Sequence, residues 1–172
     1  MAQNGRIHRA MVQVAMPRHE PLDGALFLSS RCPDRERSET LYELLNSRDR
    51  MIPFERSADG LTMLLSRREI GWVSLNPELS PLEIFLPPEL TIVREELVQV
   101  HFLDGSEASG LLQMDLPHQR CRASDYMNNR NDFFPLSTPG RILLVNKRAV
   151  RDMIVFETSP VPNPSPNGSR VA

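Results

Sequence analysis

The stretch Leu45-Asn-Ser-Arg-Asp-Arg-Met-Ile-Pro-Phe54 recurs later in the chain as Met127-Asn-Asn-Arg-Asn-Asp-Phe-Phe-Pro-Leu136. Asn, Arg and Pro stand at the same places in both copies, and a large apolar residue stands at each of the other apolar places. The stretch indicates an internal duplication, and the rest of the chain can be laid out around it.

Two further blocks repeat in the same order. Val-Gln-Val occurs at 12–14 and again at 98–100, and the apolar hairpin at 61–75 is restated at 141–155. The offset between the copies falls from 86 to 82 to 80 along the chain, as small deletions in two loops would produce. We therefore predict a first unit at residues 11–75 and a second unit at residues 97–157.

Each unit has the pattern of about five short strands and one short helix. Strand-like apolar runs lie at 10–16, 25–29, 51–54, 61–65 and 70–75, and again at 97–103, 108–114, 133–136, 141–145 and 150–157. Thr40 and Glu43 have the spacing of a capping box, and Ser124 is expected to cap the second helix. Pro53 predicts that its strand lies at a sheet edge or is bulged, and Pro135 predicts that its strand lies at a sheet edge.

Small units of this content commonly close into barrels, because closure removes exposed strand edges. The predicted fold class is mainly β: two tandem, duplicated small β-barrel-like units, each with one short inserted helix. Residues 1–10 are expected to form a polar N-terminal arm. Residues 76–96 form a Pro-rich linker that should run extended against one or both units, and residues 158–172 form a Pro-rich tail with almost nothing to bury.

Part of the second unit resembles the Sm-like and SH3-like small β-barrels. Residues 98–112 resemble the opening Sm-like hairpin, with an Asp-Gly turn and a Gly-Leu-Leu strand, and residues 141–150 resemble the closing hairpin. The resemblance implies a barrel whose closing turn helps to bind RNA. The chain departs from the Sm-like pattern in its helix, which lies inside the unit instead of before the first strand.

Composition argues against several classes of function. The 172-residue chain has a net charge of −2, which disfavours a protein whose main role is to coat nucleic acid. Aromatic residues make up 6%, too few for a base-stacking platform. Cys32 and Cys121 lie in unrelated contexts and are expected to be free thiols. The N-terminal ten residues lack the apolar run of a signal peptide, and no apolar run is long enough to span a bilayer, so a cytoplasmic location is expected.

No motif for a chemical reaction is present. The sequence contains no GxSxG, P-loop or GxGxxG, and its four histidines are scattered without metal-ligand spacing. We therefore expect no catalytic residue, no cofactor and no metal site, and we expect that the protein is not an enzyme.

Two basic turns are candidates for anion binding. Arg67 and Arg68 in the first unit occupy the places of Lys147 and Arg148 in the second. The resemblance to Sm-like proteins implies phosphate contacts here. A pair of solvated hairpin turns accounts for the same residues, and the overall negative charge favours that reading.

The repeated Asn46/Asn128 and Arg48/Arg130 are open to two interpretations. They could form a duplicated polar pocket for a ligand. Alternatively, each Asn ends its helix in a left-handed conformation and each Arg bonds nearby backbone carbonyls. The sequence favours the structural interpretation.

The linker and the tail are the candidate partner-binding segments. Both are unusually rich in proline, and the linker is too apolar to lie free in solvent. The residues expected to contact a partner are Leu82, Ile84, Phe85, Leu86, Pro87, Pro88, Pro160, Pro162 and Pro164.

These observations lead to two functional hypotheses. The first is a non-catalytic accessory or scaffolding subunit that stabilises a larger protein assembly. In this hypothesis the two units pack as an intramolecular pseudo-dimer, and the assembly could be a membrane-embedded bioenergetic or photosynthetic complex with this subunit on its cytoplasmic face. The alternative is an Sm-like nucleic-acid-binding module that uses the basic turns of the two units.

Overall fold

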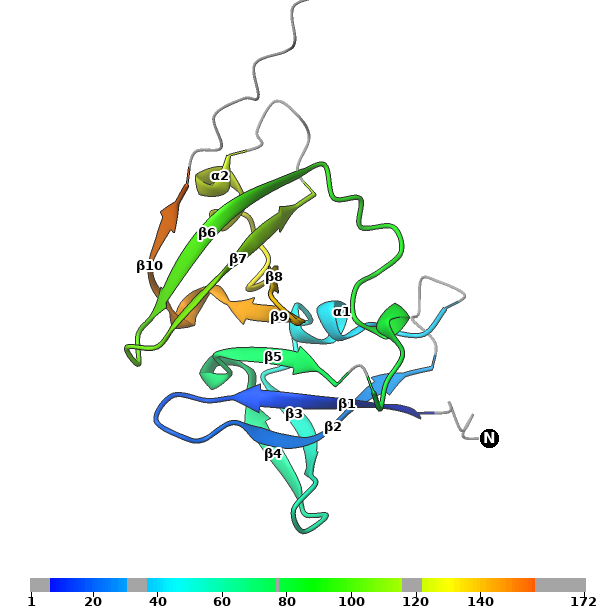
Figure 1. Ribbon diagram of the computed structural model, residues 1–172. Coiled ribbons are helices and arrows are strands. Elements are labelled where there is room, and N and C mark those ends of the chain that lie inside the picture. The colour runs from blue at the N-terminus through cyan, green and yellow to red at the C-terminus, as the bar shows by residue number, and fades with distance from the viewer. Residues whose placement is uncertain (1–6, 31–36, 77, 116–121, 157–172) are drawn as a thin grey trace, which may run out of the picture.

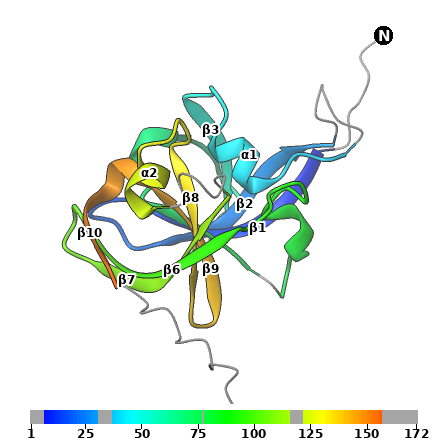
Figure 2. The ribbon, with the colours of Figure 1, turned by 90° about the horizontal axis from the view of Figure 1, so that it is seen from above.

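The computed structural model describes residues 7–30, 37–76, 78–115 and 122–156 (Figure 1). Over these ranges the protein is mainly β, because ten antiparallel strands form a single sheet with few helices. The two halves of the chain lie one above the other in Figure 1, with β5 and β9 between them. Figure 2 shows the same arrangement from above, with α1 and α2 on neighbouring sides.

The two halves contain the same order of elements. The first has β1 (Ile7–Ala15), β2 (Leu22–Ser29), α1 (Leu41–Leu45), β3 (Met51–Arg56), β4 (Thr62–Ser66), the 3-10 turn η1 (Arg67–Glu69) and β5 (Trp72–Leu75). The second has β6 (Arg94–Phe102), β7 (Glu107–Met114), α2 (Ala123–Met127), β8 (Phe133–Thr138), β9 (Arg141–Asn146), the 3-10 turn η4 (Lys147–Ala149) and β10 (Val150–Val155). A further 3-10 turn, η2 (Leu82–Ile84), lies in the linker. Residues 7–10, expected in the polar arm, belong to β1.

The strands follow the order β10-β6-β7-β8-β9-β5-β1-β2-β3-β4. In each half the first strand pairs with the second and fifth, and the third pairs with the second and fourth. The fourth and fifth strands of a half do not pair with each other; instead β9 pairs with β5 of the other half. The prediction of closed barrels is therefore wrong, since the sheet is continuous and ends at β4 and β10. The arrangement does not establish that the halves are duplicated units, and the duplication stays a prediction.

The prediction of edge strands at Pro53 and Pro135 is also wrong. β3 lies between β2 and β4, and β8 lies between β7 and β9. The ladder from β2 stops at Phe54, and the ladder from β7 stops at Leu136. Each of these residues directly follows the proline in the chain, so neither ladder includes the proline. A proline is tolerated in these inner strands because its missing N–H falls where that ladder has already stopped.

Both helices are five residues long. α1 has the predicted capping box: Glu43 N donates to Thr40 Oγ1 at 3.3 Å, and Thr40 N donates to the Glu43 carboxylate at 3.0 Å. α2 begins after Arg122 without a side-chain cap, so the expected cap at Ser124 is wrong.

Two hydrophobic clusters form the core, and each takes residues from the other half. The cluster of the first half includes Phe133 from β8 and Leu144 from β9. The cluster of the second half has Trp72 from β5 packed against it. The halves therefore share core residues where β5 meets β9.

Two glycines allow neighbouring strands to approach closely. Gly24 lies opposite Val12 in the β1–β2 pair, and Gly110 lies opposite Val98 in the β6–β7 pair. An added Cβ on either glycine would lie 2.3 Å from a backbone oxygen of the next strand. No side chain fits at either position without displacing that strand.

Candidate functional site

The junction of the two halves is built by the antiparallel pairing of β5 with β9. Trp72, Val73 and Ser74 lie opposite Val145, Leu144 and Leu143. One more backbone bond extends this ladder, because Asn146 N donates to Gly71 O at 2.9 Å. The turns η1 and η4 flank these two strands, so the junction brings the two predicted basic turns together.

A groove of ≈ 390 Å³ lies at this junction. We call it the arginine groove. Its lining combines both basic turns with the loop before β3 and the start of β8, and consists of Arg48, Arg50, Arg67, Arg68, Asp132, Phe133, Asn146 and Arg148. Five guanidinium groups and one carboxylate give the groove an excess of positive charge, which favours an anionic ligand.

Two of the four predicted anion-binding residues are engaged within the protein. Arg67 donates to Leu45 O at 2.9 Å and Asp49 O at 2.8 Å, and pairs with Asp132 at 2.8 Å. Lys147 Nζ donates to Tyr126 O and to both the backbone and side-chain oxygens of Asn129. Each cation therefore holds the end of the helix in its own half.

Burial affects the Lys147 amine. It lowers the pKa of Lys147 from 10.5 to about 8, and nearby Asp132 opposes this shift. The lysine is thus placed to hold backbone carbonyls, at the cost of part of its hydration.

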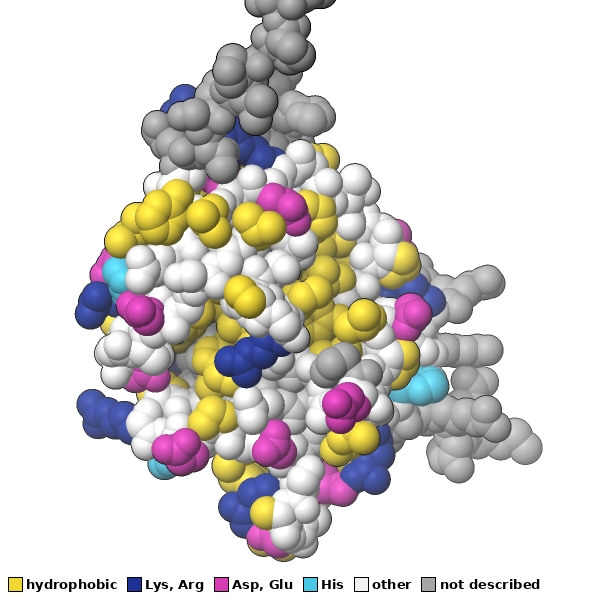
Figure 3. All heavy atoms as spheres, in the orientation of Figure 1, with side chains coloured by type: hydrophobic (Ala, Val, Ile, Leu, Met, Phe, Trp, Pro, Cys, Tyr) yellow, Lys and Arg dark blue, Asp and Glu magenta, His cyan; other side chains and the backbone are white. Residues whose placement is uncertain are grey.

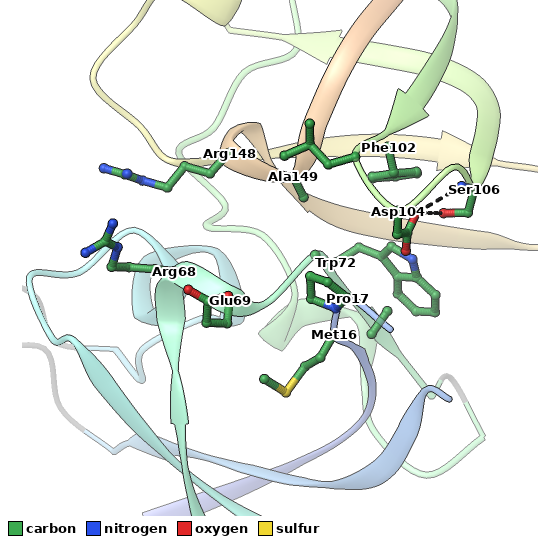
Figure 4. Close-up of a pocket in the computed structure, with 13 residues that line it drawn as sticks. Met16, Pro17, Arg68, Glu69, Trp72, Phe102, Asp104, Ser106, Arg148 and Ala149 are labelled. Carbon is green, nitrogen blue, oxygen red and sulfur yellow. Dashed lines mark hydrogen bonds between the residues drawn. The ribbon is translucent and has the colours of Figure 1, made fainter. Parts of the chain in front are cut away.

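Arg68 and Arg148 are the other two predicted anion-binding residues, and both are exposed. They come from η1 and η4 and extend toward the same side of the molecule (Figure 4). Both also line a neighbouring pocket of ≈ 230 Å³ with an apolar floor of Met16, Pro17 and Trp72. The pair of basic turns therefore contributes one exposed arginine each to a shared surface.

The sequence reasoning did not find the whole groove. Arg50 was not singled out, and Arg48 was considered together with Arg130, which does not line the groove. Both Arg48 and Arg50 belong to the repeated stretch at residues 45–54. The groove could not be predicted from the sequence because its lining joins the loop before β3 in the first half to the turn η4 in the second half.

The repeated asparagines do end the helices, although not as predicted. Asn46 has φ −96° and Asn128 has φ −93°, so the expected left-handed conformation is wrong. Their side chains bond the helix carbonyls Tyr42 O and Ser124 O at 3.0 and 2.8 Å. The backbone carbonyls near the helix ends are bonded by Arg67 and Lys147, the residues of the basic turns.

The linker packs mainly on the first half. Phe85 and Pro87 are buried, and Phe85 belongs to the first core cluster, where Ile84 and Leu86 pack against it. Phe85 O also accepts from Tyr42 N at 3.1 Å, which fixes the linker to the start of α1. The linker packs against the protein as expected, but the expectation of an extended run is wrong, because it contains turns and the 3-10 turn η2. Its own fold occupies part of the predicted partner surface.

Leu82, one of the predicted linker contacts, is 62% exposed. With Phe85, Leu75 and Ile142 it lines an apolar groove of ≈ 290 Å³ beside the β8–β9 turn. On the face shown in Figure 3, hydrophobic side chains gather over the upper half and beside the linker. Pro88 is exposed as well, and Pro160, Pro162 and Pro164 lie outside the described residues.

Within the described ranges, no three His, Cys, Asp or Glu side chains gather as a metal site would require. In the same ranges, no helix has the length and apolar character needed to cross a membrane.

The fold and the junction define a mainly β protein with a positively charged groove between two similarly ordered halves. In comparisons with protein families, with curated proteins and with solved structures, the chain matches none of them.

Proposed function

We propose that the protein is a non-catalytic subunit of a larger protein assembly, which it joins through the open edges of its sheet. The observation that carries this proposal is the pairing of β4 and β10 on one side only. A free strand edge presents unpaired N–H and C=O groups, which can accept another strand. Proteins that remain alone usually protect such edges.

The side chains at both edges support the proposal. Leu64 in β4 is 64% exposed, and Ile154 in β10 is 44% exposed. Leu61, Met51, Val155 and Phe156 are also exposed close to these strands. Apolar side chains next to unpaired backbone favour a protein partner over solvent.

The linker adds a smaller contribution. Leu82 and its apolar groove remain accessible to a partner, whereas Phe85 and Pro87 are occupied by contacts within the chain. No described residue favours a membrane-embedded complex over another assembly, so the proposal is limited to a protein assembly.

Native mass measurement tests this proposal. The tagged chain, expressed at its natural level in its own source, should elute in a complex well above its 19.6 kDa mass. Leu64→Lys and Ile154→Lys should each shift it toward the monomer. Leu111→Lys is the matched control, because Leu111 is equally apolar and 38% exposed but lies in the inner strand β7. A wild-type chain that elutes as a monomer in its native source overturns the proposal.

We also infer that the two halves are copies of one unit. The same order of elements and the same strand pairings in both halves support this inference. So do the matched positions of Gly24 and Gly110, and the matched bonding of Asn46 and Asn128 to helix carbonyls. Descent of both halves from one ancestral unit accounts for the same residue type and the same bonding at these matched positions.

A second candidate function is binding of a nucleic-acid backbone in the arginine groove. The specific observation in its favour is that Arg68 and Arg148, from turns about 80 residues apart, line one groove with Arg48 and Arg50. Phosphate groups bind such clustered guanidinium groups through paired, charge-assisted hydrogen bonds.

Fluorescence anisotropy with a labelled single-stranded RNA tests this candidate. Binding should weaken with rising salt, because phosphate contacts release counterions. The double variant Arg68→Ala/Arg148→Ala should reduce affinity at least about tenfold, whereas Arg122→Ala, an exposed arginine outside the groove, should not. Absence of binding at low salt, or equal losses in both variants, removes the candidate.

A further inference from the structure

We propose that the partner at the open edges is a second copy of this chain, with β10 of one copy paired to β4 of the next. This inference rests on the proposed function and specifies its partner. The junction inside the chain provides the template, since there a fifth strand, β5, already pairs with a fourth strand, β9. The unpaired edges are the remaining fourth and fifth strands, β4 and β10.

The positions of β10 and β5 correspond residue by residue. Val73 lies opposite Val14 of β1, and Met153 lies opposite Val100 of β6. The same correspondence places Leu144 of β9 at the position of Leu64 in β4, because they lie opposite Pro135 and Pro53. The pair Val73–Leu144 therefore predicts the pair Met153–Leu64 between two copies, with Ile154 opposite Met63.

The burial of equivalent residues differs in the way that an unoccupied second junction predicts. Leu144 and Phe133 lie at the internal junction and are fully buried. Their counterparts at the free edge, Leu64 and Met51, are equally apolar but 64% and 48% exposed. Pairing with a second copy would cover both and remove a hydrophobic surface from water.

A side-chain contact across the junction also has an unused counterpart. Asn46 accepts from Phe133 N at 2.8 Å and donates to Phe133 O at 3.3 Å, so it links the end of α1 to β8. Asn128 ends α2 in the same way and is exposed. Its counterpart target is the backbone of Met51, which lies opposite Ser66 as Phe133 lies opposite Asn146.

One contact of the template is not repeated. Arg67 pairs with Asp132 across the internal junction, but the counterpart of Asp132 is Arg50 and that of Arg67 is Lys147. Two cations therefore approach at the proposed contact, which should be weaker than the internal one. Replacing Arg50 by Asp recreates the carboxylate of the template.

Head-to-tail pairing of this kind uses two different surfaces, so an added copy can itself accept a further copy. Such contacts produce a closed ring if the rotation closes and an open chain if it does not. The pairing itself is the same in both cases.

Disulfide trapping tests the pairing and its register. Ser74–Leu143 lies three positions along the ladder from the bonded Gly71–Asn146 pair. Because bonded and non-bonded pairs alternate in an antiparallel ladder, Ser74–Leu143 is a non-hydrogen-bonded pair. Its counterpart, Ile154–Met63, should bring the two Cα atoms to about 4.5 Å, within reach of a disulfide. The background chain carries Cys32→Ser and Cys121→Ser.

Two differently tagged chains are mixed, one with Met63→Cys and the other with Ile154→Cys. The expected result is a mixed disulfide dimer that forms at least about tenfold faster than with Met63→Cys and Leu103→Cys, since Leu103 lies in the β6–β7 turn, outside both edge strands. Equal rates in the two mixtures, or no mixed dimer, overturn the inference.

Sedimentation of the purified full chain gives a second measurement. Asn128→Ala should weaken self-association about tenfold, as the loss of the proposed backbone bonds predicts, and Arg50→Asp should strengthen it. A chain that stays monomeric at high concentration overturns this inference. If that chain still elutes in a large complex from its native source, the proposed function stands with a different partner.

Discussion

Asn46 and Phe133 lie 87 residues apart, yet the Asn46 side chain bonds both the N–H and the C=O of Phe133. The same side chain donates to Tyr42 O at the end of α1. One amide thus satisfies the end of a helix in the first half and the start of a strand in the second. This contact joins the halves independently of the β5–β9 ladder.

Replacing Asn46 should therefore destabilise the protein more than replacing its repeat. Asn46→Ala leaves Phe133 N–H without its side-chain acceptor and removes the side-chain bonds to Phe133 O and Tyr42 O. The expected cost is about 1–3 kcal/mol in the free energy of unfolding. Asn128→Ala, measured at a dilution where the chain is monomeric, removes one exposed bond and should cost less than about 1 kcal/mol. Urea denaturation of both variants checks the difference, and equal losses would show that the cross-junction bonds contribute nothing.

Lys147 should make stability depend on pH above neutrality. Its pKa is about 8 in the folded chain and 10.5 as the unperturbed value. Between these limits the unfolded state binds more protons than the folded state, so the free energy of unfolding should rise with pH. The expected rise is roughly 1 kcal/mol, less than the full shift implies, because the half-buried amine is screened by solvent.

The tyrosines limit that window at its upper end. Burial raises the pKa values of Tyr42 and Tyr126 above 10.0, so above this pH the folded state retains protons that the unfolded state loses, and stability should fall. Chemical denaturation across this pH range measures the profile. Lys147→Met should lack the rising part and keep the decline, and a rise that survives this substitution would assign it to another group.

Gly110→Ala should be strongly destabilising although the substitution adds a single methyl group. The new Cβ would lie 2.3 Å from Ser137 O, a backbone atom that cannot move without shifting β8. We expect a loss of about 2–4 kcal/mol, at the level of overpacking in a core. Ser109→Ala, one residue away in the same strand, is the control and should change stability by less than about 0.5 kcal/mol. Thermal unfolding of the two variants distinguishes a steric effect from a general intolerance of β7.

The linker should contribute to stability through Phe85. Phe85→Ala removes a buried aromatic ring from the first core cluster and should cost about 3–5 kcal/mol. Leu82→Ala, three residues earlier and exposed, should be close to neutral in stability. Guanidinium denaturation of both variants checks this contrast. A small effect at Phe85 would mean that the linker packs without stabilising the fold.

Much of the local structure could be predicted from residues alone. The alternation of apolar residues located all ten strands to within a few residues, and the Thr40–Glu43 spacing located the start of α1. These features depend on side-chain period and on contacts within a few residues, which the sequence displays directly. Pro53 misled the prediction because a proline limits one side of a strand, and the other side remained free to pair with β4.

The candidate site could be predicted only in part. The basic turns were visible because they repeat, but Arg67 and Lys147 are engaged by carbonyls at the helix ends. Arg48 and Arg50 line the groove because the two halves face each other. No local sequence pattern indicates that these arginines lie close to Arg148 of the other half. The sequence showed that the linker is apolar and should pack against the protein. That Phe85 is buried in the first core cluster depends on the tertiary structure.

By itself, the sequence determined which residues form strands, where the chain turns and which faces are apolar. The tertiary structure decided that β9 pairs with β5, so that the sheet stays open where closed barrels were expected. The physical reason is that every strand edge offers the same backbone N–H and C=O groups, so local sequence does not name the partner of an edge. The choice depends on packing between residues about 70 positions apart in the chain, such as Val73 and Leu144, which becomes visible only when the whole chain has folded.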